Sequence, residues 1–112
     1  MTVYVVQKQM RFDHSKGELV PKFPELGKAK RWGDLIYLLT PTASPFNSEK
    51  IIKEIREKLA TFNETDHLLL IGNPTLIGAC AAIAATNNNG KIRCLQWSGK
   101  QRDYTEIFLS LW

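Results

Sequence analysis

The chain has 112 residues, of which 44% are hydrophobic and 23% charged, and its formal net charge is +4. This composition is that of a folded globular protein and excludes a disordered tail, and the length suits a single domain spanning residues 1–112. The two cysteines, Cys80 and Cys94, lie in apolar segments without CxxC spacing or a neighbouring histidine. We therefore expect two buried thiols rather than a zinc site, as suits a reducing cytoplasm.

The charge is unevenly distributed along the chain. Residues 1–31 hold seven basic and three acidic residues, residues 32–90 hold four and six, and residues 91–112 hold four and two. This basic excess is compatible with nucleic acid or with an acidic partner and proves neither. Residues 68–85 carry no charge, but Gly72, Asn73 and Pro74 interrupt them, so we expect no membrane segment.

The first third of the chain predicts one strand and a long irregular excursion. Thr2–Gln7 (TVYVVQ) is rich in β-branched and aromatic residues, which favour a strand. Residues 10–33 are broken by prolines and glycines and predict the excursion. Asp34–Thr40 (DLIYLLT) is a continuous apolar run, which indicates a central strand covered on both faces.

The middle of the chain predicts a strand, helix and strand unit. Asn47 or Ser48 could cap a helix, since Ser and Asn side chains accept hydrogen bonds from the first helical turn. Apolar residues follow at helical spacing, and these are Ile51, Ile52, Ile55, Leu59 and Phe62. The next apolar run, His67–Ile71, predicts a strand, and a right-handed crossover would make it parallel to Asp34–Thr40.

The last third predicts an alanine-rich helix followed by a hairpin. Thr75–Thr86 has no charged face, and a helix that is apolar all round is normally covered on two sides. Asn87–Gly90 predicts its end, and Lys91–Trp97 and Tyr104–Leu111 predict the two hairpin strands. The expected fold is thus α/β, with a mostly parallel sheet of about five strands, two helices and a C-terminal β-hairpin.

The stretch IGNPT, residues 71–75, has two interpretations. Gly72 permits an unusual backbone, Asn73 can cap, and Pro74 is well tolerated at the first helical position, which together explain a tight structural corner. A helix start also exposes N–H groups that favour an anion such as a nucleotide phosphate. Because the segment contains neither GxGxxG nor a P-loop motif, the structural interpretation is favoured.

Three loops are expected to meet at the carboxyl edge of the sheet, namely residues 40–48, 72–75 and 97–103, the last only if its strand is parallel. Ligands of open α/β sheets bind at this edge. Ordinary connections have the same Ser, Thr and Pro content. The candidate ligand-binding residues are Thr42, Ser44, Gly72, Asn73, Thr75, Lys100 and Arg102.

Other patterns bear on nucleic acid, catalysis and self-association. Aromatic and basic residues alternate in Arg11-Phe12, Lys22-Phe23 and Arg31-Trp32 and again at residues 93–104, as in some single-strand binders, although aromatic residues are more often core. We predict no catalytic residue, metal site or cofactor, because neither histidine sits in a recognisable motif. Gly78 and Ala82, four residues apart, would permit close helix approach in a homo-oligomer. The rival cover for that helix is the excursion, folded back through Phe12, Leu19, Val20, Phe23 and Leu26.

The C-terminal half resembles a family of small proteins from tailed bacteriophages and prophages. The pattern comprises IGNP at residues 71–74, the alanine-rich helix, Asn89-Gly90, Trp97, and Arg102 with Tyr104. The resemblance implies a phage accessory protein in the bacterial cytoplasm and carries no known activity or catalytic residues. We therefore predict a non-enzymatic protein that binds a host or phage macromolecule, with a protein partner and a homo-oligomer favoured. The alternative is a nucleotide or nucleic-acid binder that uses the edge around Gly72 to Thr75.

Overall fold

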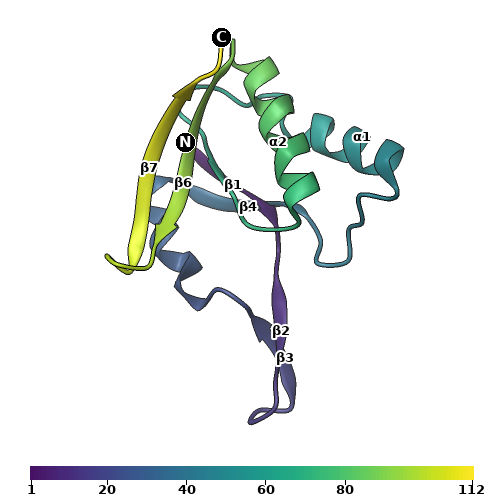
Figure 1. The fold of residues 1–112 in the computed structure, drawn as a ribbon, viewed down its shortest axis with the longest axis vertical. Coiled ribbons are helices and arrows are strands. Elements are labelled where there is room, and N and C mark those ends of the chain that lie inside the picture. The colour runs from purple at the N-terminus through teal and green to yellow at the C-terminus, as the bar shows by residue number, and fades with distance from the viewer.

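The computed structural model describes residues 1–112, apart from the side chain of Pro24, and contains a five-stranded sheet in the order β4-β1-β5-β6-β7 (Figure 1). The strands β4, β1, β5 and β6 are parallel, and β7 runs antiparallel to β6. The predicted mostly parallel sheet with a terminal hairpin is therefore confirmed. The strand bounds are Thr2–Gln7 for β1, Asp34–Leu39 for β4, His67–Leu69 for β5, Lys91–Ser98 for β6 and Asp103–Ser110 for β7.

Both predicted helices lie on one face of this sheet (Figure 1). They are α1, Ser48–Lys58, and α2, Pro74–Asn87, and they share a buried cluster with sheet residues such as Val6, Leu68 and Cys94. The predicted side-chain cap of α1 is wrong, because Asn47 occupies the cap position without a side-chain hydrogen bond. The cap of α2 is confirmed, since Asn73 accepts from the N–H of Thr75.

The opposite face is covered by a 3₁₀ helix, η1, Pro24–Trp32. Ala29, Leu26 and Trp32 pack there against Val3, Val5 and other sheet residues in a second buried cluster. The excursion after β1 therefore contains regular structure that its prolines and glycines did not reveal. Its suggested packing over the alanine-rich helix is wrong, because the sheet separates η1 from α2.

The strand expected to be central lies at the edge of the sheet. β4 pairs only with β1 among the described strands, and Ile36 is exposed. β1 is the central strand instead, with β4 on one side and β5 on the other and with five of its six residues buried. A continuous apolar run indicates a strand with apolar side chains on both faces, but it carries no information about the strand's neighbours.

The remaining elements form a ribbon that projects from the body of the protein (Figure 1). Strands β2, Met10–Asp13, and β3, Glu18–Pro21, pair antiparallel in a separate two-stranded sheet. We call residues 10–21 the arm. An isolated hairpin is at best marginally stable in water, so an arm of this kind depends on its anchored base or on a partner for order.

Two further expectations have an outcome in the structure. Cys80 and Cys94 are free and buried, as predicted, and burial raises the pKa of both thiols. Among the helices described, none is long and apolar enough to cross a membrane.

Candidate ligand site at the carboxyl edge of the sheet

The carboxyl ends of the parallel strands create a crevice beside β1 and β5. The connection after β1 leads to η1 on one face of the sheet, whereas the connection after β5 leads to α2 on the other. Neighbouring strands whose connections separate in this way form a topological switch point, where open α/β sheets bind their ligands. The fold therefore places a candidate site outside the ends of β1 and β5.

Gln7, the last residue of β1, joins two of the loops that were expected to meet here. Its side-chain amide donates to the carbonyls of Thr40, at 3.1 Å, and Ala43, at 3.2 Å, and its Oε1 accepts from the N–H of Asn73 at 2.9 Å. The Gln7 side chain is buried. It thus fixes the β4–α1 loop against the start of α2.

The IGNPT corner is held by its own hydrogen bonds. Gly72 has φ +140°, and an added Cβ would lie 2.6 Å from Cβ of Gln7, so only glycine fits without displacement. The N–H of Asn73 is bonded to Gln7, the N–H of Thr75 is bonded to the Asn73 side chain, and Pro74 has no N–H. Because these donors are already engaged, the geometry favours a structural corner over a phosphate cradle.

The structure separates the predicted ligand-binding residues into groups. Thr42 and Ser44 line a hollow of about 180 Å³ between the β4–α1 loop and α1. Gly72 faces a larger pocket on the other side of the corner. Lys100 and Arg102 lie in the β6–β7 turn, where the Arg102 carbonyl accepts from Lys28 of η1 at 2.8 Å. One compact site made from all seven residues is therefore absent from the described structure.

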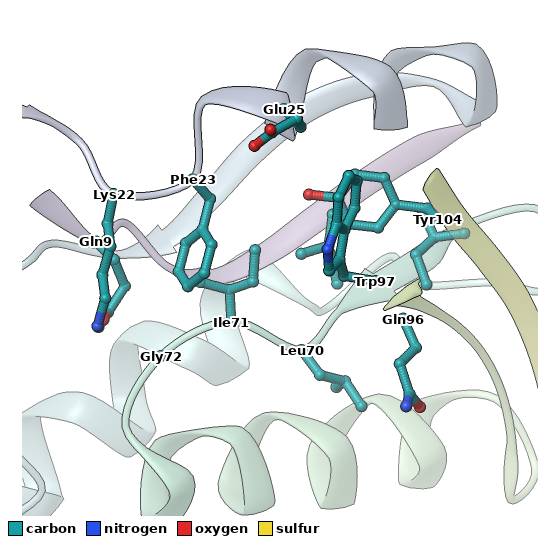
Figure 2. Close-up of a pocket in the computed structure, with 12 residues that line it drawn as sticks. Gln9, Lys22, Phe23, Glu25, Leu70, Ile71, Gly72, Gln96, Trp97 and Tyr104 are labelled. Carbon is teal, nitrogen blue, oxygen red and sulfur yellow. The ribbon is translucent and has the colours of Figure 1, made fainter. Parts of the chain in front are cut away.

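The larger cavity, which we call the edge pocket, has a volume of about 550 Å³ and opens over the end of β5 (Figure 2). This volume lies within the range of small-molecule sites. Phe23 stands on one side of it, with Trp97 and Tyr104 together on the other, while Leu70 and Gln96 point toward α2 (Figure 2). The other lining residues are Gln9, Lys22, Glu25, Leu69, Ile71, Gly72 and Leu95.

The aromatic rings of the edge pocket differ in exposure, and the exposed ring of Trp97 packs against the buried ring of Tyr104. Trp97 and Tyr104 are cross-strand partners whose ring centroids lie 5.1 Å apart in an edge-to-face arrangement. Trp97 keeps 37% of its surface exposed, whereas Tyr104 is buried. Burial, with a smaller contribution from Glu25, raises the pKa of the Tyr104 hydroxyl. The pocket thus offers flat apolar surfaces, with the side chains of Gln9 and Lys22 beside Phe23 (Figure 2).

Cations surround the pocket, together with two carboxylates. Lys22 lines it directly, and Nζ of Lys28 lies 5.6 Å from the centroid of the Trp97 ring. Arg102 is exposed and approaches Glu25 at 4.0 Å. A hydrogen bond from the Tyr104 N–H, with a smaller contribution from Arg31 at 2.9 Å, lowers the pKa of Asp103. The carboxylates are thus paired, and the net charge around the opening remains positive.

The sequence matches the family described as "Phage Pam3 gp32-like protein" over residues 1–111. The chain belongs to this family. The predicted membership of a phage protein family is confirmed at that level, and the match extends through the N-terminal half, which the sequence pattern did not cover. No curated protein and no solved structure gave a match.

Two features of this family member's site were missed or only partly anticipated from the sequence. Gln7, Gln9 and Gln96 were not singled out, although a buried amide at the end of an apolar strand is a usable signal of a structural hydrogen-bond hub. Phe23, Trp97 and Tyr104 were noted as aromatic residues near basic ones, as part of a cover for the alanine-rich helix or as part of the family pattern, but not as the walls of one pocket. Their convergence required the pairing of β6 with β5, which no local pattern reports.

The outward surface of α2 is distinct from the edge pocket. Gly78 and Ala82 are both exposed, and a Cβ added at Gly78 would meet no atom within 4 Å. The helix packs on the sheet and beside α1 through residues such as Leu76, Cys80 and Ala84. The predicted interface residues are therefore accessible in this chain, and their role in self-association stays a prediction.

Proposed function

We propose that this phage protein is a non-enzymatic accessory protein of the host cytoplasm that acts by binding a macromolecule, and that the macromolecule is single-stranded nucleic acid. The observation that carries the proposal is the edge pocket, in which Phe23, Trp97 and Tyr104 surround a cavity of about 550 Å³ at the switch point of the sheet. Unpaired bases stack on such rings, and cations follow the backbone.

The charge distribution supports a polyanion over a neutral ligand. Residues 1–31 and 91–112, which supply most of the pocket, contain eleven basic and five acidic residues. The segment with both α helices, residues 32–90, has an acidic excess instead. The basic excess therefore lies in the segments that supply most of the pocket, and a basic excess of this kind attracts phosphate groups.

The test is oligonucleotide binding measured by fluorescence anisotropy as a function of salt. A single strand of about 12 nucleotides, the scale of known single-strand sites, should bind, and the affinity should fall steeply between about 50 and 200 mM salt. Trp97→Ala should weaken binding about five- to a hundred-fold, because one stacked base is lost. Trp112→Ala is the matched control, since Trp112 is exposed at the other end of the β6–β7 hairpin and should leave affinity unchanged.

Two results would oppose the proposal. Absence of binding at low salt would remove nucleic acid as the partner. An equal loss in Trp97→Ala and Trp112→Ala would show that any exposed tryptophan contributes, and the edge pocket would then have no special role.

A protein partner is the second candidate, favoured by the free edge of the sheet. β7 pairs only with β6 among the described strands, and Phe108, Leu109 and Leu111 near its end are exposed. An exposed apolar edge strand is a template for an added strand from another chain. Replacing Leu109 with Lys should abolish such pairing while leaving oligonucleotide affinity intact, which separates the two candidates.

A further inference from the structure

The arm starts where the edge pocket is formed. β1 ends at Gln7, and the arm leaves the sheet at Met10 beyond the carboxyl edge (Figure 1). The residues that flank the arm, Gln9 on one side and Lys22 with Phe23 on the other, line the pocket (Figure 2). The N–H of Lys22 donates to the carbonyl of Gln9 at 3.0 Å, so the base of the arm is closed. Any ligand in the pocket therefore lies directly beside the arm.

The surface of the arm is apolar at a place that packing within this chain does not explain. Phe12 and Leu19 are cross-strand partners with 50% and 64% of their surfaces exposed. No described side chain of residues 10–21 belongs to either buried cluster. The Phe12 ring contacts His14 edge-to-face at 4.9 Å between centroids, which holds the ring against the ribbon and leaves much of it open.

The formal charges of the arm balance, and its two cations are both exposed. Arg11 and Lys16 are exposed, and the arm also carries the acidic residues Asp13 and Glu18. Asp13 turns into the hairpin, where it accepts hydrogen bonds from the Ser15 hydroxyl and from the N–H groups of Ser15 and Lys16. These bonds, the first above all, lower the pKa of its carboxyl group. These hydrogen bonds stabilise the ionised carboxylate and hold it against the turn. With Lys22 at its base, the arm has three cations against two carboxylates, an excess of one positive charge beside the pocket.

We propose that the arm and the edge pocket form one continuous track for a single strand of nucleic acid. One base occupies the pocket between Phe23 and Trp97, and the strand continues along the arm with another base against Phe12. Arg11 and Lys16 contact phosphates of that continuation. This inference rests on the proposed function, since it requires that nucleic acid enters the pocket, and it adds a second contact that the pocket alone does not supply.

Ligands of different length test the pocket and the arm separately. A thymidine monophosphate, titrated by NMR, reaches only the pocket, whereas a thymidine strand of about 12 nucleotides, as in other single-strand sites, reaches both parts. Phe12→Ser should weaken the long strand about five- to a hundred-fold, the effect of one lost stack, and leave the mononucleotide unchanged. Trp97→Ala should weaken both ligands.

Salt dependence tests the phosphate contacts separately. Arg11→Gln and Lys16→Gln should each reduce the slope of log affinity against log salt by about 0.7 for the long strand, because each removes one phosphate contact. The matched control is Lys53→Gln, since Lys53 is an exposed lysine of α1 far from the arm in sequence and on the other face of the sheet. This variant should retain the slope of the unmodified protein.

The outcomes distinguish failure of the track from failure of the proposed function. If Phe12→Ser and Arg11→Gln bind the long strand as the unmodified protein does, while Trp97→Ala does not, the arm has no part in binding and only the pocket remains. If the unmodified protein binds no oligonucleotide, both ideas are wrong. Tighter binding of duplex than of single strand overturns the track, because a paired base cannot enter the pocket.

Discussion

At the scale of single residues, Gln7 decides the geometry of the carboxyl edge. One buried amide satisfies backbone carbonyls of the β4–α1 loop and an N–H at the start of α2. Backbone hydrogen bonds from the N–H of Gln7 to the carbonyl of Ile71, at 2.9 Å, and from the N–H of Lys8 to the carbonyl of Leu39, at 3.1 Å, hold the strand ends that lead into these loops. An uncharged side chain thereby fixes the relative positions of two loops that flank the candidate site.

Gln7→Leu should destabilise the protein by about 1–3 kcal/mol, because it retains much of the side-chain volume but leaves partly buried backbone groups without partners. Urea unfolding followed by circular dichroism measures this change. Gln101→Leu, in the exposed β6–β7 turn, is the control and should fall within about 0.5 kcal/mol of the unmodified protein. Equal stability of the two variants would show that the Gln7 hydrogen bonds contribute nothing.

Burial makes Cys80 a pH-sensitive part of the core. Its pKa is raised from 9.0 to about 12 by desolvation. Between these two values the unfolded chain releases the thiol proton and the folded protein keeps it, so stability falls as the pH rises above about 9. In Cys80→Ala the thiol is absent, so its contribution to the fall in the free energy of unfolding is absent too. The stability advantage of the unmodified protein over the variant should therefore shrink between about pH 8 and pH 10. A constant difference across that range, or rapid alkylation of native Cys80 at neutral pH, would contradict the assignment.

At the scale of elements, the two glycines of the α2 region have opposite roles. Gly72 precedes the helix with φ +140° and lies against Gln7, whereas Gly78 lies within the helix with open space around it. Glycine is required at the first position by conformation and contact. At the second it weakens the helix, because glycine loses more backbone entropy on folding than alanine does.

The same substitution should therefore change stability in opposite directions. Gly72→Ala should cost about 1–3 kcal/mol through backbone strain and displacement of Gln7. Gly78→Ala should stabilise the protein by about 0.5–1 kcal/mol through helix propensity. Thermal and urea unfolding of the two variants side by side measure the signs, and a stabilising Gly72→Ala would mean that the corner has a different backbone.

At the scale of the whole molecule, the sheet has different surfaces on its two sides. The η1 side carries Phe23, Trp97 and Tyr104 of the edge pocket (Figure 2), and the arm projects beyond the carboxyl edge (Figure 1). The α2 side presents a helix that carries no charged side chain and whose outward residues include Gly78 and Ala82. Extended apolar surface is uncommon on monomers, so this side remains the expected place for contact between copies.

We predict a dimer in sedimentation equilibrium at high micromolar protein concentration, formed through α2. Ala82→Glu should give monomers or insoluble protein, because an unpaired carboxylate in a dry interface is costly. Lys53→Gln again serves as a surface control and should not alter association. A monomeric unmodified protein at all concentrations would remove this interface, without bearing on the edge pocket on the other side of the sheet.

The sequence by itself determined the local elements. β1 has its predicted bounds, and the bounds of α1 and α2 lie within a few residues of the predicted ones. The residue types in IGNPT were sufficient to predict the Asn73 cap and the unusual backbone of Gly72. These features depend on residues only a few positions apart, so periodicity and capping rules suffice to predict them. The phage family was likewise indicated by a contiguous pattern and confirmed by the match to residues 1–111.

The tertiary structure alone decided where these elements lie and which residues form the site. It placed β4 at the edge, η1 on the face opposite α2, and Phe23 across the edge pocket from Trp97. Each of these relations joins segments that are distant in the sequence through strand pairing and shared burial. Because an apolar run fixes that a segment is buried but not which segment it is buried against, strand order and the pocket were fixed only when the whole sheet had formed.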